Sequence, residues 1–330
     1  MTIAFTICSN SFLAHTKTML DSLRVHHPEI GTFIFLVDLP DASVDYSIFA
    51  PADVIVADEK IIPGFAELLD RYNVIELSTS LRPFVIRYLQ DRFAEASKLY
   101  YIDPDMVVYD RLDVIDQLLE NQDIIITPHF LQPLPLDGQV PFENLALNYG
   151  TYNLGFFALK PHTTNTNSFL NWWGERTSQF GHIDPANGYF TDQIWFNLVP
   201  LFFKKVHTLL HPGYNMAAWN LHERSISSYE ENGNIMLGSG ERLVIYHFSS
   251  WNIKHPDQLS RYYNRYSFTD RPDLVKLYED YRLALVRNRV DFFSKIPCAL
   301  PYNRKTVKRS RVQKILLPGI KLMRRVWQKI

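Results

Sequence analysis

The sequence predicts an α/β protein with a mostly parallel central sheet. Short apolar segments typical of strands alternate with longer segments in which apolar residues recur at helical spacing, above all in the first half of the chain. Strands that are separated by helices form parallel sheets with both faces covered. A hydrophobic content of 46% and a length of 330 residues allow a large core, in one large domain or two smaller ones.

The first half of the chain has the clearest alternation of strands and helices. Apolar runs mark the expected strands, and helices are expected where apolar residues share one face. Ser78 or Thr79 is expected to cap the helix that ends near Phe93. The expected strands are 3–8, 32–38, 53–57, 99–102, 106–109 and 123–127, and the expected helices are 14–27, 78–93 and 113–120.

The second half begins with a polar, proline-rich loop over residues 128–150. A loop of this length is usually functional or mobile. The elements expected after it are a strand over 152–159, helices over 167–180 and 190–198, and a strand over 243–248. A charged helix over 272–289 is expected to end the folded body.

Two aspartates separated by one proline mark the most informative point of the chain. Asp103 and Asp105 lie between an apolar strand and Met106, which begins the next one. Residues two apart in an extended chain point the same way, and Pro104 keeps this segment extended. Two carboxylates at the carboxyl end of a parallel strand, where such sheets bind ligands, suit a divalent cation. The alternative is that Asp-Pro-Asp forms an ordinary turn.

The distribution of charge argues against broad nucleic-acid binding. The net charge is −1, but residues 304–330 contain ten Lys and Arg and no Asp or Glu, which leaves a net charge of −11 on the rest. The two cysteines, Cys8 and Cys298, indicate neither a disulfide framework nor a cysteine zinc site, and they fit a reducing, cytoplasmic compartment. We expect no signal peptide and no segment that spans a membrane.

Several short polar motifs accompany the aspartate pair along the chain. They are Arg82-Pro83-Phe84, Tyr152-Asn153-Leu154-Gly155, Asp192-Gln193, His211-Pro212-Gly213-Tyr214-Asn215, Trp219-Asn220 and Tyr246-His247-Phe248-Ser249-Ser250-Trp251. In this order, over residues 3–251, the chain resembles glycosyltransferases of the GT-A fold, closest to the bacterial group that is similar to family 8. The resemblance implies a Rossmann-like nucleotide-diphospho-sugar transferase fold with a C-terminal helical extension. We expect a glycosyltransferase domain over 1–291, with a nucleotide-binding half (1–127) and a sugar and acceptor half (128–291). The charge pattern adds a basic amphipathic tail over 292–330.

The resemblance implies a donor site around the aspartate pair. Asp103 and Asp105 would bind Mn²⁺ or Mg²⁺ together with His247, and a neutral imidazole suits Mn²⁺ somewhat better. For His247 the alternative is a histidine satisfied at a strand end. The residues that would hold the nucleoside are Thr6, Cys8, Ser9 and Asn10, with Asp58 as a weaker candidate for contact with the base or ribose.

Basic side chains near the motifs are expected to reach the donor phosphates. Arg82 is favoured over Arg87 because it falls in the first turn of a predicted helix, although a solvated helix charge is the alternative for both. Family 8 enzymes tend to carry a glycine and then a lysine six residues after the histidine. Here Ile253 occupies that position and Lys254 follows it, so that Lys254 is the candidate for a diphosphate clamp.

Two further motifs resemble the segments that line the sugar pocket. Gly155 would let the backbone approach the ligand and Asn153 would offer both a donor and an acceptor, although a simple turn is the alternative. Asp192 and Gln193 would face the donor sugar and the acceptor hydroxyl, although Asp192 also suits a helix N-terminus. The candidates for stacking on sugar rings are Trp219 and Trp251, and the tryptophans expected in the core are Trp172, Trp173 and Trp195.

The reaction expected from the resemblance is metal-dependent transfer of a glycosyl group from a nucleotide-diphosphate sugar, usually a UDP-sugar, to an acceptor hydroxyl. An inverting enzyme needs a carboxylate base, for which Asp192 is the candidate, whereas a retaining enzyme of the family 8 type, which the resemblance favours, needs none. Two rival functions are a sugar-nucleotide pyrophosphorylase and a catalytically silent, membrane-associated scaffold. A pyrophosphorylase should have a glycine-rich loop after its first strand, and residues 8–12 contain no glycine.

The basic C-terminal segment predicts contact with an anionic membrane. From residue 320, apolar residues at 320, 323, 326, 327 and 330 fall on one side of a helix, with basic residues mainly opposite. A stripe of this kind with a tryptophan is typical of an interfacial helix, and each Lys or Arg near an anionic leaflet contributes about 1 kcal/mol. A peripheral location on the inner face of the cytoplasmic membrane would suit a lipid-linked acceptor, such as a polysaccharide or lipopolysaccharide precursor. A disordered basic tail is the alternative.

Overall fold

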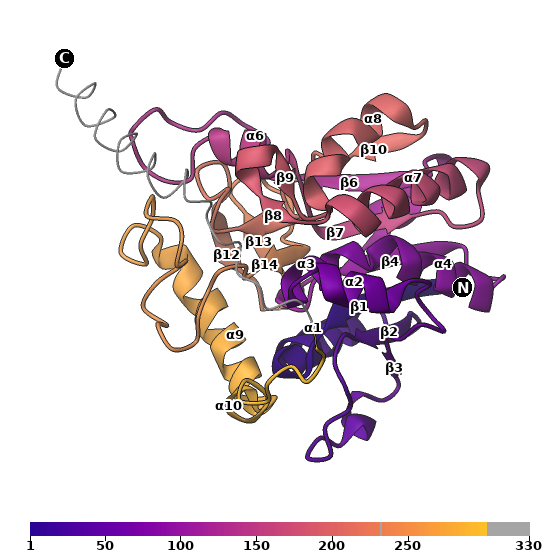
Figure 1. Cartoon of the computed structure of the whole chain (residues 1–330). Coiled ribbons are helices and arrows are strands. Elements are labelled where there is room, and N and C mark those ends of the chain that lie inside the picture. The colour runs from indigo at the N-terminus through magenta and orange to yellow at the C-terminus, as the bar shows by residue number, and fades with distance from the viewer. Residues whose placement is uncertain (232, 302–330) are drawn as a thin grey trace, which may run out of the picture.

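The central feature of the molecule is a seven-stranded sheet in the order β10-β6-β7-β4-β1-β2-β3 (Figure 1). The computed structural model describes residues 1–231 and 233–301. The strands are β1 (Thr2–Cys8), β2 (Gly31–Leu36), β3 (Asp53–Val56), β4 (Lys98–Ile102), β6 (Ile124–Pro128), β7 (Tyr152–Leu159) and β10 (Val206–Thr208). The β1–β2, β1–β4, β2–β3 and β6–β10 pairs are parallel, and β7 runs antiparallel to β4 and β6. The predicted α/β class with a mostly parallel sheet is therefore confirmed.

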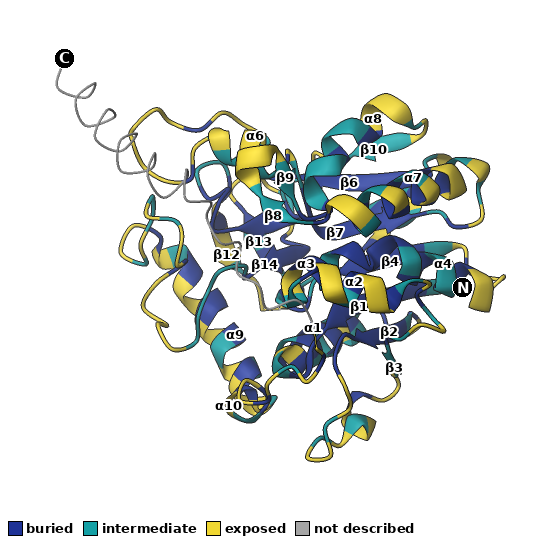
Figure 2. Cartoon of the chain, viewed as in Figure 1, coloured by how far each residue is buried: buried dark blue, intermediate teal, exposed yellow. Residues whose placement is uncertain are grey.

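Helices cover both faces of this sheet, because its strands are apolar on both sides (Figure 2). In β1, Ile3, Phe5 and Ile7 belong to one hydrophobic core, while Ala4 and Cys8 belong to the other. The helices whose buried residues join the Ala4 and Cys8 core are α1 (Leu13–His26), α5 (Asp113–Asn121), α9 (Val275–Arg287) and α10 (Val290–Phe293). The helices of the opposite core are α2 (Phe65–Arg71), α3 (Val74–Ser80), α4 (Arg82–Arg92) and α7 (Thr164–Phe180).

A second, three-stranded sheet brings distant segments to the end of β4. It consists of β11 (Met216–Ala217), β14 (Ile245–His247) and β5 (Met106–Val108), in that order. The β5 strand pairs antiparallel with β14, so that Met106 lies opposite His247. The amide of Phe248 also donates to the carbonyl of Asp105 at 2.9 Å. Two short hairpins complete the strands of the described residues, β8 (Ile183–Asp184) with β9 (Tyr189–Phe190) and β12 (Ile226–Tyr229) with β13 (Ile235–Leu237).

The predicted helix over 78–93 is wrong, because two helices, α3 and α4, meet at Leu81. Asn73 caps α3 with a complete capping box that includes Glu76. The hydroxyl of Ser78 donates to a carbonyl one turn back within α3, as does that of Thr79, so neither residue is a cap. Proline in the first turn suits a new helix start, and the sequence places Pro83 there.

Two segments differ in detail from the predictions. The loop over 128–150 contains a short helix, α6 (Asn144–Tyr149). The segment over 190–198 is not one α-helix: Phe190 ends β9, a 3₁₀ helix spans Gln193–Leu198, and α8 (Val199–Phe202) follows. The proline at position 200 fits the first turn of α8.

Residues beyond α9 continue to pack on the body. Phe293, Ile296 and Leu300 are buried, so the folded part extends past the boundary expected at residue 291. The backbone amide of Ala299 donates to Asp38 Oδ1 at 2.7 Å, which ties this segment to the end of β2. The basic segment from residue 304 and the interfacial helix predicted over 320–330 lie outside the described residues. Within the described residues, none of the helices has the length and apolar character needed to cross a bilayer.

Candidate active site

The aspartate pair and His247 converge at the junction of the two sheets. Asp103 follows β4, Asp105 precedes β5 and His247 ends β14. One ligand atom from each residue lies within 4.8 Å of the others. The Nε2 atom of His247 is 3.1 Å from Asp105 Oδ1 and 3.9 Å from Asp103 Oδ2. The His247 side chain is buried, but those of Asp103 and Asp105 are 22% and 24% exposed. Two carboxylates and one imidazole that share an open side can hold a divalent cation.

Electrostatic coupling between His247 and Asp105 favours the protonated imidazole and the ionised carboxylate. Burial lowers the pKa of His247. The neighbouring Asp105 carboxylate has the opposite and larger effect, so the pKa lies above its ordinary value. Burial raises the pKa of Asp105, but His247 more than offsets this effect, so that the pKa is lowered. A cation would replace the proton of His247 as the partner of the Asp105 carboxylate.

Gly155, in β7, makes room for the imidazole of His247. A Cβ atom at this position would lie 2.6 Å from Cε1 and 2.8 Å from Nδ1 of that ring, and 2.6 Å from Cε of Met106. The carbonyl of Gly155 also accepts from the amide of Asp103 at 2.7 Å. We expected Gly155 to line the sugar pocket. In the structure, the lack of a Cβ atom at this glycine leaves room for the ring of His247.

Arg82 connects Asp103, Asp105 and His247, here called the cation cluster, to another carboxylate. One terminal nitrogen, Nη2, donates to Asp103 Oδ1 at 2.9 Å and to the hydroxyl of Tyr101 at 3.1 Å. The other, Nη1, donates to both oxygens of Asp192, at 3.2 Å and 3.0 Å. The guanidinium also stacks on the ring of Tyr101, 4.2 Å from its centroid. Burial alone would lower the pKa of Arg82, but Asp192, Tyr101 and Asp103 together raise it, so that Arg82 stays charged.

Asp192 is fully buried, with no exposed side-chain surface. Burial raises its pKa to about 6, although Arg82 opposes this shift. The carboxylate is therefore ionised at neutral pH and is held by Arg82. The structure brings Arg82 and Asp192 to Asp103, but both terminal nitrogens of Arg82 are bonded to protein groups.

Asn153 and Gln193 lie beside each other, next to the cation cluster. Gln193 Nε2 donates to the carbonyl of Tyr149 at 2.7 Å, and its Oε1 accepts from Asn153 Nδ2 and from the amide of Leu154, both at 3.4 Å. Asn153 Oδ1 accepts from the amide of Gly155 at 3.1 Å. A shift in the register between β6 and β7 occurs at this point, and such bulges re-aim side chains. The two amides expected to contact sugar thus share one hydrogen-bonded cluster.

The residues expected to hold the nucleoside lie at the carboxyl end of β1, but the side chains of Cys8 and Asn10 already bond to other protein groups. Cys8 is buried in the core, where it accepts from Thr16 Oγ1 at 3.2 Å, and burial raises the pKa of its thiol to about 12. Asn10 Nδ2 donates to the carbonyl of Leu39 at 2.8 Å, and its Oδ1 accepts from the hydroxyl of Tyr46 at 2.6 Å. The Asn10 side chain therefore ties the end of β1 to the segment after β2.

The remaining candidates have more varied surroundings. The buried hydroxyl of Thr6 has no hydrogen-bond partner among the described residues, while that of Ser9 bonds to Ser11 Oγ at 2.9 Å. Asp58 accepts from the amides of residues 60 and 61, which makes it a turn residue after β3. Lys254 is exposed on the segment that follows β14.

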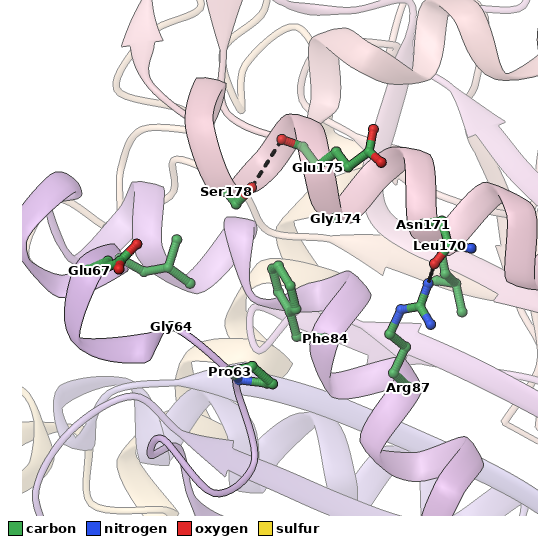
Figure 3. Close-up of a pocket in the computed structure, with 11 residues that line it drawn as sticks. Pro63, Gly64, Glu67, Phe84, Arg87, Leu170, Asn171, Gly174, Glu175 and Ser178 are labelled. Carbon is green, nitrogen blue, oxygen red and sulfur yellow. Dashed lines mark hydrogen bonds between the residues drawn. The ribbon is translucent and has the colours of Figure 1, made fainter.

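Arg87 lies in a different part of the protein from Arg82. It faces a surface groove between α2, α4 and α7, where it donates to Asn171 (Figure 3). The same groove is lined by Phe84 and by the carboxylates of Glu67 and Glu175. Of the two arginines that the sequence left as alternatives, Arg82 is the one at the cation cluster.

Comparison with known proteins supports one fold. No family model matches the chain. The uncharacterized protein YfnF of Bacillus subtilis (strain 168) is 26% identical over 212 residues, which cover 62% of this chain and 66% of that protein. The bifunctional glycosyltransferase WbbM superposes with a TM-score of 0.51 at 13% identity, over 87% of this chain and 51% of that one. The chain has the GT-A glycosyltransferase fold.

Two further solved structures with similarity to this GT-A fold are also glycosyltransferases. The galactosyltransferase LgtC, in complex with donor and acceptor sugar analogues, aligns at 14% identity with a TM-score of 0.48, over 87% of this chain and 96% of that one. GlyE of Streptococcus pneumoniae TIGR4 aligns at 15% identity with a TM-score of 0.47, over 90% of this chain and 65% of that one.

The GT-A fold gathers polar residues to which the sequence motifs assigned no role. His129, at the start of the proline-rich loop, is buried beside Asn153. Asn215 and Asn220 are fully buried next to the small sheet. The available signal was a polar residue within an apolar run, as at Tyr214-Asn215-Met216. His15 of α1 was also missed; burial lowers its pKa, and Asp105 partly opposes the shift.

The tryptophans of this GT-A fold serve mainly as packing groups. Trp173 is fully buried, as expected. Trp172 and Trp195 are half-buried, with their rings 6.3 Å apart. Trp219 is 3% exposed and its ring lies edge-on to His247 at 5.2 Å, so it supports the histidine ring. Trp251 packs against Tyr281 at 5.5 Å and is half-buried.

Proposed function

We propose that this protein is a metal-dependent glycosyltransferase that moves a hexosyl group from a nucleotide-diphosphate sugar to an acceptor hydroxyl. The observation that carries the proposal is the convergence of Asp103, Asp105 and His247 at the carboxyl edge of a GT-A sheet, with Arg82 and Asp192 attached to the same cluster. A UDP-sugar is the proposed donor.

The donor set fits a hard divalent cation. Asp103, Asp105 and His247 would hold Mn²⁺ or Mg²⁺, which when bound neutralises charge on the leaving diphosphate. The two oxygens of Asp103 have different neighbours. Oδ1 accepts from Arg82 and Tyr101, and Oδ2 faces His247. The arginine therefore holds the carboxylate in one orientation while leaving an oxygen for the cation. Such preorganised charge is generally the largest contribution to catalysis at sites of this kind.

The surroundings of Asp192 support a retaining reaction. A general base must approach the proton that it removes. Asp192 has no exposed surface, and both of its oxygens accept from Arg82. These contacts favour a role in holding Arg82 and the sugar side of the site, and the leaving phosphate would then take the acceptor proton.

The proposed acceptor is a carbohydrate, free or lipid-linked, in the synthesis of a cell-surface polysaccharide or lipopolysaccharide. Support comes from the ten basic residues of the segment 304–330, which suit an anionic leaflet. We accordingly propose a peripheral location on the cytoplasmic membrane.

Thermal unfolding with nucleoside diphosphates tests the donor site. UDP with Mn²⁺ should raise the Tm of the wild type by a few degrees, since a ligand at a hundred times its Kd adds about 2.7 kcal/mol. The shift should disappear in D103N and persist in D91N, which changes an exposed aspartate of α4. Turnover of UDP-sugars would then identify the sugar. Absence of a shift with every nucleotide would overturn the proposal and favour a scaffold.

A further inference from the structure

A continuous chain of buried hydrogen bonds links His247 to a second histidine. It runs from His129 through Asn153 and Asn215 to His247, and all four side chains are buried. We propose that Asn215 is a positioning residue that holds His247 with its Nδ1 protonated and its Nε2 lone pair facing the cation site. This inference rests on the proposed function, because it concerns the same metal cluster.

A backbone amide sets which atom donates at each step of this series of hydrogen bonds. Asn153 Oδ1 lies 3.1 Å from the amide of Gly155, and a backbone N–H can only donate, so this end of the Asn153 side chain must be its oxygen. The same oxygen lies 3.1 Å from the side chain of Asn215. The atom that Asn215 presents to it must therefore be the amide nitrogen.

A second contact leads independently to the same orientation of Asn215. The hydroxyl of Thr127 donates to the backbone carbonyls of Asn153 and Phe156, both at 3.0 Å, which commits its proton. Its oxygen can then only accept, and Asn215 Nδ2 lies 3.3 Å away. With its nitrogen directed to Thr127 and Asn153, Asn215 must direct Oδ1 to His247.

The orientation of Asn215 decides the tautomer of His247. Asn215 Oδ1 lies 3.3 Å from Nδ1 of the ring, and an amide oxygen can only accept, so Nδ1 carries a proton. A neutral imidazole then has its lone pair on Nε2, the atom that faces Asp105 and Asp103. Ligating histidines generally donate their second nitrogen to such a partner.

His129 fixes the opposite end of the chain. Its Nδ1 lies 3.3 Å from the carbonyl of Thr151 and must donate to it, which leaves Nε2 to accept from Asn153 Nδ2 at 3.4 Å. Burial lowers the pKa of His129 to about 4, so the ring is neutral at neutral pH. Every donor in this series of hydrogen bonds, from Thr151 to His247, thus meets an acceptor.

Asn215 occupies an unusual backbone position, which suits this role. Its φ is 55°, a left-handed conformation that Asn tolerates better than most residues. Asn220 Nδ2 donates to the backbone carbonyls of Asn215, at 3.0 Å, and of His129, at 3.1 Å. The residue is thereby held where β11 begins, beside β14.

The test variant should remove the side chain of Asn215 without straining the backbone. N215G does so, because glycine accepts positive φ. K205G is the matched control, since Lys205 is exposed and has a φ of 50°. We would measure Mn²⁺ affinity by electron paramagnetic resonance, and the tautomer of His247 by NMR of ¹⁵N-histidine in the Mg²⁺-loaded protein.

We expect N215G to bind Mn²⁺ about 10- to 100-fold more weakly than the wild type, as is typical when such a partner is removed. K205G should bind as the wild type does. The NMR spectrum should report Nδ1–H at His247 in the wild type and a loss of that preference in N215G. A purely structural role would lower stability without changing the tautomer.

Two results would overturn the inference: unchanged Mn²⁺ affinity in N215G, or an Nε2–H tautomer at His247 in the wild type. The second measurement needs no variant, so it decides even if N215G does not fold. If the wild type binds no Mn²⁺ with or without UDP, the proposed function itself fails. The two failures are thereby distinguished.

Discussion

Asp103 and Asp192 contact the same arginine, yet their surroundings differ. The Asp103 side chain is 22% exposed and that of Asp192 is 0% exposed. Asp103 gives one oxygen to Arg82 and keeps the other toward His247, whereas Asp192 gives both oxygens to Arg82. One aspartate is therefore available to a ligand, and the other is part of the support. Residue type alone does not distinguish these roles, but the number of unused oxygens and the exposure do.

Removing the shared arginine should have the largest effect on stability. R82M leaves the buried carboxylate of Asp192 without its partner, which should lower the free energy of unfolding by about 3–5 kcal/mol. Urea unfolding of the variant and the wild type measures the difference. R87M, at a half-buried arginine in the groove of Figure 3, is the control and should cost far less. Equal effects of the two substitutions would refute the support role.

The pH dependence of stability should separate Asp192 from ordinary aspartates. Its pKa in the folded state is about 6, against an ordinary value of 3.8 for an aspartate, so the folded protein binds more protons than the unfolded chain between these values. Stability from this group therefore falls as pH rises through that window, by on the order of 3 kcal/mol, and the loss is complete above about pH 6.

The measurement for Asp192 is urea unfolding from about pH 4 to about pH 7 for the wild type and D192N. The wild type should lose stability relative to D192N as the pH rises. A gain over the same range would mean that Arg82 outweighs burial and depresses the pKa of Asp192.

A substitution at the seat of His247 should produce the smallest effect on stability. G155A places a methyl group 2.6 Å from Cε1 of His247 and from Cε of Met106, which should cost about 1–3 kcal/mol by overpacking. Mn²⁺ binding should weaken because the ring must move. G174A is the matched control in α7, where the new Cβ meets Phe84 at an ordinary 3.6 Å. Calorimetric titration of both variants with Mn²⁺ checks the prediction; unchanged binding in G155A would contradict it.

The sequence was most informative where short-range pattern decides structure. Runs of apolar residues located the strands of the main sheet except β10, and the pair Asp103 and Asp105 located the cation cluster at the end of β4. The break between α3 and α4 was missed, although its signals are local: Asn73 with Glu76, and Pro83 in the first turn of α4. The error came from choosing Ser78 or Thr79 as the cap.

Partners far apart in the chain could not be predicted in the same way. Arg82 and Asp192 are separated by 110 positions, and Asn215 and His247 by 32. A lone polar residue can be satisfied by water, by backbone or by any other polar side chain, and local sequence does not select among these. For that reason the sequence did not indicate that Gly155 makes room for the ring of His247.

The sequence by itself determined the α/β class, the position of the paired aspartates and the contrast between an acidic body and a basic C-terminal segment. These properties follow from periodicity, spacing and composition, which need no knowledge of distant contacts. Only the tertiary structure decided which aspartate keeps a free oxygen, which arginine reaches the cluster and which asparagine orients His247. Those outcomes depend on how segments that are distant in the sequence pack around the end of β4, and that packing sets burial and hydrogen-bond direction together.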